Sequence, residues 1–390
     1  MKNLGVYIQV PFCQTKCTYC NFHTGVVSRE RYAPYAAAVR REIAAWLGDE
    51  NDSLRDARID TVYFGGGTPS LLDPSALANI LAELRPRLSD PSAPEITLEA
   101  DPETIDAAKA ATWRHAGFNR ISLGVQSFND DELKACGRMH RRADIFSAIK
   151  MLGEAGLANI SMDLIAGLPK QTRESWKNSV SELLAVRPEH VSIYMLEIDE
   201  GSRLGRESLA GGTRYSAEAI PEDDAIAEFY ESARARLAAA DYEHYEISNW
   251  ALPGKRSRHN LKYWQREPYL GFGAAAHSFD GRVRWANVHD SARYVACIEQ
   301  GITIREQIEP ITPERALEEE FFLGLRQMEG IDLKRIERAY DADLHDQVGT
   351  VRTRLESLLA QGLIEMNGSR VRLSPQRLTV SNEVFTELMG

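Results

Sequence analysis

Short apolar runs alternate with longer amphipathic stretches over the first half of the chain. The apolar runs are Leu4–Val10, Asp60–Phe64, Glu95–Ala100, Arg120–Gln126, Asn159–Ile165 and His190–Leu196. The amphipathic stretches are Arg29–Trp46, Ser70–Leu84, Pro102–His115, Arg142–Ala155 and Thr172–Ala185. Near-continuous apolar strands that alternate with helices predict an α/β fold with a parallel sheet covered by helices. Because such connections are right-handed, we expect the sheet to wind into a partial (β/α)6 barrel over residues 1–220.

The pattern changes after the sixth apolar run. Residues 200–220 are predicted to be an irregular, glycine-containing loop, followed by a helix over Asp223–Ala240 and a seventh strand over Glu243–Ser248. A dense segment, Arg258–Trp264, and a Gly/Ala-rich turn, Gly271–Ala276, come next. We expect residues 221–309 to extend the barrel.

A second unit is predicted over residues 310–390. Thr312-Pro313 combines a helix-capping residue with a proline at the first helical position. Asn367-Gly368 is a strong hairpin turn signal. The expected elements are a helix from Thr312, helices over Leu333–Tyr340 and Asp346–Gln361, and strands over Leu363–Met366 and Arg370–Leu373. These elements indicate a small α+β domain of winged-helix-like form.

Composition and charge narrow the functional classes. The 390 residues carry a net charge of −11, which argues against a general nucleic-acid binder. The basic positions Arg370, Arg372 and Arg377 keep open a nucleic-acid-binding wing, although such a group is typical of a solvated face. No apolar run approaches the roughly 20 residues of a membrane span, and the N-terminus lacks a signal-peptide core. We therefore expect a cytoplasmic protein without an integral membrane segment or a nucleic-acid partner.

Three of the five cysteines fall within eight residues, as Cys13-x₃-Cys17-x₂-Cys20. An odd, clustered set without an export signal indicates a metal or cluster site in a reducing compartment. Thiolates hold iron–sulfur clusters, and three of them leave one iron of a four-iron cluster open to a substrate. A zinc site is the alternative, with His23 as the nearest fourth ligand. Cys136 and Cys297 are predicted to be packing residues.

The segment Tyr7–Cys20 resembles the entry motif of radical S-adenosylmethionine (SAM) proteins. It is similar to the branch that contains oxygen-independent coproporphyrinogen III oxidase and a haem chaperone. The resemblance extends over nearly the whole chain. Further segments that resemble motifs of the same branch are Phe64–Ser70, Glu99–Pro102, Leu123–Phe128 and Asp163–Pro169.

This resemblance implies the cofactors and their ligands. Cys13, Cys17 and Cys20 would hold a [4Fe-4S] cluster, whose fourth iron would chelate SAM. Tyr7, Gly66 and Glu99 would line that SAM, the glycine by close backbone approach and the carboxylate by accepting from the ribose. A second SAM is contacted in the oxidase by residues that match Tyr19, Gly67, Thr68, Gln126, Arg138 and Asp163 here.

Two features distinguish the oxidase from the chaperone. The oxidase carries an extra cysteine two residues after the third, where this chain has Phe22, and an N-terminal cover that this chain is expected to lack. His259-Asn260-x-x-Tyr263-Trp264 matches a motif of the chaperone. Imidazole is a common haem ligand, so His259 is a candidate for that role, and His277 is a weaker one. The alternative is that His259 is a hydrogen-bonded core residue.

The prediction is thus a radical SAM haem chaperone that binds haem and delivers it to haem-requiring, respiratory proteins. We expect it to lack coproporphyrinogen oxidation. The alternatives are an oxidase-type enzyme and a radical SAM enzyme that reduces SAM to methionine and a 5′-deoxyadenosyl radical for another substrate. The resemblance also allows two further partners, an electron donor and a second copy of the chain in a homodimer.

Overall fold

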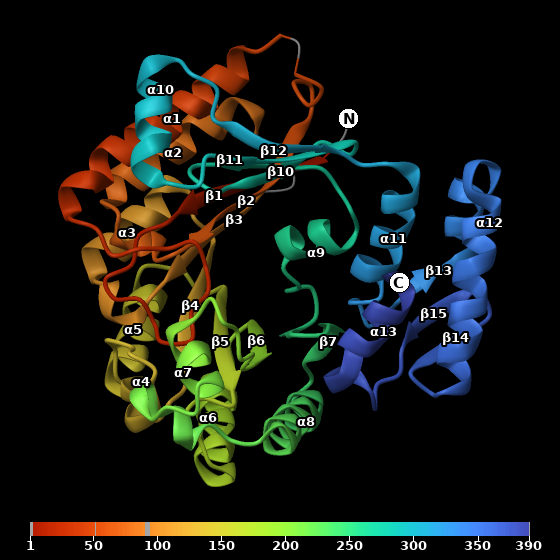
Figure 1. Cartoon of the computed structure of the whole chain (residues 1–390). Helices are drawn as coiled ribbons and strands as arrows, with labels where there is room; N and C mark the ends of the chain where they lie inside the picture. Colours follow the sequence, from red (N-terminus) through yellow and green to blue (C-terminus); the bar gives the residue numbers. More distant parts are fainter. Residues whose placement is uncertain (1–2, 51, 90–93, 390) are drawn as a thin grey trace.

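Six parallel strands form the first half of the computed structural model, which describes residues 3–50, 52–89 and 94–389. The strands are β1 (Asn3–Val10), β2 (Arg58–Gly66), β3 (Glu95–Ala100), β4 (Arg120–Gln126), β5 (Ile160–Ala166) and β6 (His190–Met195). They pair with one another in chain order. Figure 1 shows that the sheet is curved, and the predicted α/β class and partial barrel are confirmed.

Helices connect these strands and cover the outside of the curved sheet (Figure 1). They are α1 (Tyr32–Gly48), α2 (Pro74–Leu84), α3 (Ala107–Ala116), α4 (Asp130–Ala135), α5 (Arg142–Glu154) and α6 (Arg173–Val186). The short helix α4 was not predicted. It begins where the Asn129 side chain accepts hydrogen bonds from the backbone N–H groups of Asp131 and Glu132.

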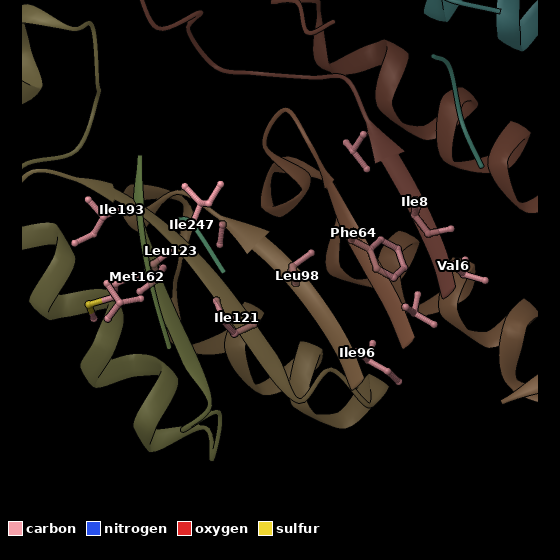
Figure 2. Packing of buried hydrophobic residues seen from close by; sticks show 14 of the residues in the cluster. Val6, Ile8, Phe64, Ile96, Leu98, Ile121, Leu123, Met162, Ile193 and Ile247 are labelled. Atoms are coloured by element: carbon pink, nitrogen blue, oxygen red, sulfur yellow. The ribbon is translucent and has the colours of Figure 1, made fainter. Parts of the chain in front are cut away.

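The strands carry different residues on their two faces. Successive side chains of a strand point to opposite faces of the sheet. Val6, Ile8, Phe64, Leu98 and Leu123 are fully buried in one hydrophobic layer, as Figure 2 shows. The alternating positions are largely polar, and they include Tyr7, Tyr63, Glu99, Ser122 and Asp163. The inner face of the barrel therefore provides polar groups, whereas the outer face provides the core.

The middle of the chain completes the same sheet. In the described residues, the twelve strands of this sheet run in the order β12-β11-β10-β9-β1-β2-β3-β4-β5-β6-β8-β7. The added strands are β7 (Glu243–Glu246), β8 (Asn249–Ala251), β9 (Tyr269–Phe272), β10 (His277–Phe279), β11 (Val283–Asn287) and β12 (Arg305–Pro310). Helices α8 (Asp223–Ala239), α9 (Arg258–Trp264) and α10 (Ser291–Gln300) accompany them. Strand β9 pairs with β1 in parallel, and β8 pairs antiparallel with β6.

The segment 200–220 is more ordered than its sequence indicates. It contains α7 (Arg203–Leu209) and a 3₁₀ segment over Arg214–Ala219. Ser202 caps α7 by accepting a hydrogen bond from the backbone N–H of Gly205. Leu204 N–H also donates to the carbonyl oxygen of Thr18, at 2.8 Å. The prediction of an irregular loop was wrong, because contacts with the cysteine loop stabilise this short helix.

The C-terminal unit consists of helices packed beside a small sheet. Its elements are α11 (Pro313–Gly324), β13 (Ile331–Asp332), α12 (Leu333–Ala360), β14 (Ile364–Asn367), β15 (Arg370–Leu373) and α13 (Ser381–Met389). The hairpin at Asn367-Gly368 is confirmed. The two helices predicted over 333–361 are one helix with a kink at Leu344, and α13 was not predicted. In the described chain, no helix is both long enough and apolar enough to span a bilayer.

Candidate cofactor site

The cysteine loop follows β1 and is held by backbone hydrogen bonds, both within the loop and to Cys136. Cys13 N–H donates to Gly25 O at 3.0 Å, Thr18 N–H to Cys136 O at 3.0 Å, and Cys20 N–H to Cys17 O at 3.2 Å. The three thiols of Cys13, Cys17 and Cys20 are free and half-buried. Burial raises the pKa of Cys13 to about 11. The loop therefore presents three sulfur atoms at the carboxyl end of a barrel strand.

A buried guanidinium lies beside these thiols. Arg138 Nη1 is 3.6 Å from Cys17 Sγ, and Arg138 Nη2 donates to the carbonyl oxygen of Gly124 at 2.6 Å. Arg138 also forms an ion pair with Asp101, and its side chain is 9% exposed. In the described part of the chain, its Nε has no hydrogen-bond partner. The sulfur atom of Cys17 therefore lies next to a fixed cation.

The glycine loop after β2 contacts both the cysteine loop and β3. Gly67 N–H donates to Val10 O at 2.8 Å, and a Cβ on Gly67 would lie 2.5 Å from the carbonyl oxygen of Phe12. Gly66 has a φ of +109°, which favours glycine. Its N–H donates to Glu99 Oε2 at 3.0 Å. The two loops thus approach each other more closely than side chains would permit.

Glu99 is held between two donors on the inner face of the barrel. Tyr63 Oη donates to Glu99 Oε1 at 2.8 Å, in addition to the Gly66 contact. Burial raises the pKa of Glu99 to about 7, and the hydrogen bond from Tyr63 opposes this shift. Tyr7, on β1, stacks on Tyr63 with ring centroids 6.0 Å apart. The first group of predicted SAM residues, Tyr7, Gly66 and Glu99, is therefore gathered in one place.

The second group lies around the ion pair of Arg138 and Asp101. Thr68 Oγ1 donates to Asp101 Oδ2 at 3.1 Å. Tyr19 packs beside Cys136. Gln126 ends β4 with a φ of +65°, and its amide lies near Gly124. Asp163 accepts from Ser122 Oγ at 3.4 Å, and burial raises its pKa to about 6.

Two contributors to this site were not singled out from the sequence. Asp101 links Thr68 to Arg138, and Tyr63 links Glu99 to Tyr7. Asp101 lies two residues after Glu99 in the segment Glu99–Pro102, so this motif could have identified Asp101 as a site residue. Tyr63 occupies the alternate position to Phe64 on β2, and strand periodicity alone could have placed it on the inner face.

His23 does not join the cysteines as a zinc ligand would. Its Nδ1 lies 2.5 Å from His289 Nε2. Within residues 3–50, 52–89 and 94–389, no three Cys, His, Asp or Glu side chains converge as they would around a single ion. The cysteines of an iron–sulfur cluster bind different irons, so they need not converge in this way.

His259 lies on α9, at the opposite end of the barrel from the cysteines. Its backbone N–H donates to Glu95, the first residue of β3. The side chain is buried, at 1% exposure, and its Nδ1 and Nε2 lie 2.8 Å from Thr61 Oγ1 and Tyr263 Oη. Burial lowers the pKa of His259 to about 3. Neither nitrogen is open to iron, so this geometry disagrees with the haem-ligand role and matches the alternative of a core residue.

Replacing His259 with alanine is expected to destabilise the fold. Thr61 Oγ1 and Tyr263 Oη would lose their partner in a buried place, at about 1–3 kcal/mol for each unsatisfied group. Urea denaturation should show a lower free energy of unfolding for His259→Ala and no change for His115→Ala, an exposed control on α3. Equal stability of the two variants would contradict the packing role.

Comparison with known proteins agrees with this architecture. The Radical SAM superfamily model matches residues 7–183, and the HemN C-terminal domain model matches residues 311–376. "Heme chaperone HemW" of Bacillus subtilis is 35% identical over 389 residues, which cover 99% of both chains. The chain belongs to the HemW family. HemW of Escherichia coli is 32% identical, over 93% of this chain and 91% of that one.

The relatives of this chain extend beyond bacteria, and its fold is shared with an enzyme. A mitochondrial radical SAM domain-containing protein 1 of Bos taurus is 31% identical, over 99% of this chain and 87% of its own length. The solved coproporphyrinogen III oxidase (HemN) of E. coli has a TM-score of 0.82 at 20% identity, over 99% of this chain and 90% of that one. This likeness shows that this chain has the fold of HemN.

The residues present fit the cofactors that the radical SAM family implies, a [4Fe-4S] cluster and SAM. Three free thiols lie on one loop, beside a buried guanidinium whose Nε has no partner among the described residues. The glycine loop adds a backbone cradle that a Cβ would fill. When bound, such a cluster supplies an electron to SAM. The protein groups of this site would orient SAM.

Proposed function

We propose that this protein is a haem chaperone, which binds haem and delivers it to haem-requiring proteins such as respiratory cytochromes. The observation that carries this proposal is the similarity to haem chaperones over 99% of the chain. Phe22 supports it, because the chain has no sulfur at the position of the extra cysteine of the oxidase. We also propose that the protein is cytoplasmic, receives electrons from a donor and forms a homodimer.

The cofactor ligands in this proposal are the residues of the site described above. Cys13, Cys17 and Cys20 would hold the [4Fe-4S] cluster. Tyr7, Gly66 and Glu99 would bind SAM, the last through a carboxylate already aimed by two donors. Tyr19, Gly67, Thr68, Gln126, Arg138 and Asp163 would bind a second SAM.

An oxidase-type radical SAM enzyme is the second candidate. The observation in its favour is the fold, which matches that of HemN over 99% of this chain. Phe22 and the similarity to chaperones argue against this candidate.

The two candidates make opposite predictions for one preparation. The full chain with an anaerobically reconstituted cluster is expected to bind haemin stoichiometrically and to leave coproporphyrinogen III unchanged. Haemin titration followed by absorbance measures the first property, and chromatography of the porphyrins measures the second. Steady formation of protoporphyrinogen, or no haemin binding at all, would overturn the chaperone proposal.

A further inference from the structure

A pair of exposed histidines lies at the edge of the cysteine loop, outside the predicted cofactor site. His23 comes three residues after Cys20, and His289 lies between β11 and α10. Their rings are nearly perpendicular, with centroids 4.0 Å apart. A third exposed histidine, His277, is close enough that its charge lowers the pKa of His23, after the larger effects of burial and His289. Neither His23 nor His289 is used by the site described above.

The hydrogen bonding of His23 leaves one ring nitrogen available. Its Nδ1 lies 2.5 Å from His289 Nε2, and the described residues provide no partner for its Nε2. A histidine that ligates a metal usually donates its other ring N–H to an acceptor, which sets the tautomer and the ring orientation. In the tautomer whose Nδ1–H donates to His289, Nε2 of His23 carries a free lone pair. His259 differs in this respect, because both of its nitrogens are bonded.

The surroundings of His23 fit a porphyrin better than a bare metal ion. Phe22 and Val26 flank it along the chain and are 67% and 59% exposed. An exposed aromatic next to an imidazole offers a face for an apolar macrocycle. Lys16 Nζ donates to the carbonyl oxygen of Phe22 at 3.2 Å, which places a cation beside the same residue for a propionate carboxylate. No convergence of three ion ligands is found there or elsewhere in the described chain.

We propose that Nε2 of His23 is the axial ligand of the haem that this chain carries, with His289 orienting the imidazole and Phe22 packing on the porphyrin. This inference rests on the proposed haem-chaperone function and names its binding site. The haem would lie at the exposed rim of the cysteine loop, where an acceptor protein can reach it.

The test compares variants of the full chain with a reconstituted cluster. Haemin is titrated into the wild type, His23→Ala, His289→Ala and the exposed control His115→Ala, and absorbance and electron paramagnetic resonance spectra are recorded. We expect His289→Ala to weaken haemin binding about ten-fold and His23→Ala to weaken it further. Added imidazole should restore the ligand spectrum in His23→Ala, and His115→Ala should match the wild type.

Each outcome decides one of the two proposals. No haemin binding by the wild type overturns the chaperone function itself. Binding by the wild type and equal binding by His23→Ala and His289→Ala leave that function standing and overturn this site. A thiolate-type haem spectrum, or zinc binding at His23 and His289 with haemin binding unaffected, also overturns the site. If His23→Ala loses iron and sulfide, its haemin binding does not test the site. The haemin affinity of His289→Ala then decides between the outcomes, because His289 lies outside the cysteine loop.

Discussion

Replacing Cys17 with serine is expected to abolish assembly of the iron–sulfur cluster. A hydroxyl group is a much poorer ligand for iron than a thiolate, and the remaining Cys13 and Cys20 could bind only two irons. Cys17 Sγ is also the sulfur atom 3.6 Å from Arg138 Nη1, so the variant removes the thiol that this cation faces. The measurements are the broad visible absorbance of the cluster and the iron and sulfide contents after anaerobic reconstitution.

Cys297→Ser is the matched control for this experiment. Cys297 is a free, half-buried cysteine on α10, outside the cysteine loop. We expect Cys297→Ser to keep the wild-type iron content. Full iron and sulfide contents in Cys17→Ser would contradict the cluster assignment, and zinc in place of iron in the wild type would restore the zinc alternative.

The affinity for SAM is expected to rise with pH because Glu99 must lose its proton to bind it well. Burial raises the pKa of Glu99 to about 7, so its ionised fraction grows about ten-fold between pH 6 and pH 8. A carboxylate accepts hydrogen bonds from ribose hydroxyls, whereas the protonated acid is a weaker acceptor. Equilibrium dialysis of labelled SAM should therefore show an increase of about ten-fold over this range.

Two variants separate the possible sources of this pH dependence. Glu99→Gln is expected to bind SAM weakly with a flat profile, whereas Glu30→Gln, at an exposed position, should behave like the wild type. If Asp163 were responsible instead, the midpoint would lie near 6 and Asp163→Asn would flatten the curve. An unchanged rise in Glu99→Gln would contradict the role of this residue. Cluster content is measured at each pH.

The same pKa shift has a consequence for the chain without cofactors. The pKa of Glu99 in the folded chain is higher than its ordinary value of 4.5, so the folded chain holds this proton more tightly than the unfolded chain. Its neutral form therefore favours folding below pH 4.5, and this contribution is lost as the pH rises through about 7. Bound SAM would offset the loss, because ligand binding stabilises the folded state.

The barrel could be predicted from the sequence because its signal is local. Each of the six parallel strands produces an apolar run, and each following helix has its own amphipathic spacing. The helix in segment 200–220 could not be predicted from the sequence, because the contacts that order it come from the cysteine loop, nearly two hundred residues earlier. The polar inner face was not predicted for a different reason. The near-continuous apolar character of the runs obscures the positions of Tyr7, Glu99 and Asp163, which alternate with apolar residues.

The hydrogen-bond partners of His259 and His23 could not be predicted from the sequence. The spacing of His259 and Tyr263 places both on one face of a helix, but the partner of the second ring nitrogen, Thr61, belongs to β2. His23 looked like a fourth zinc ligand because it is near the cysteines in sequence. Its actual partner, His289, lies 266 residues away along the chain.

The sequence by itself determined the alternation of strands and helices in the six-stranded barrel, the cysteine loop, the glycine loop and the family to which the chain belongs. These features depend on residue types at short spacing, which folding does not alter. Only the tertiary structure decided which ring nitrogens are bonded, which carboxyl groups are buried, and that Arg138 faces Cys17. These properties depend on partners supplied by distant segments, and hydrogen bonding and burial exist only once those segments are packed together.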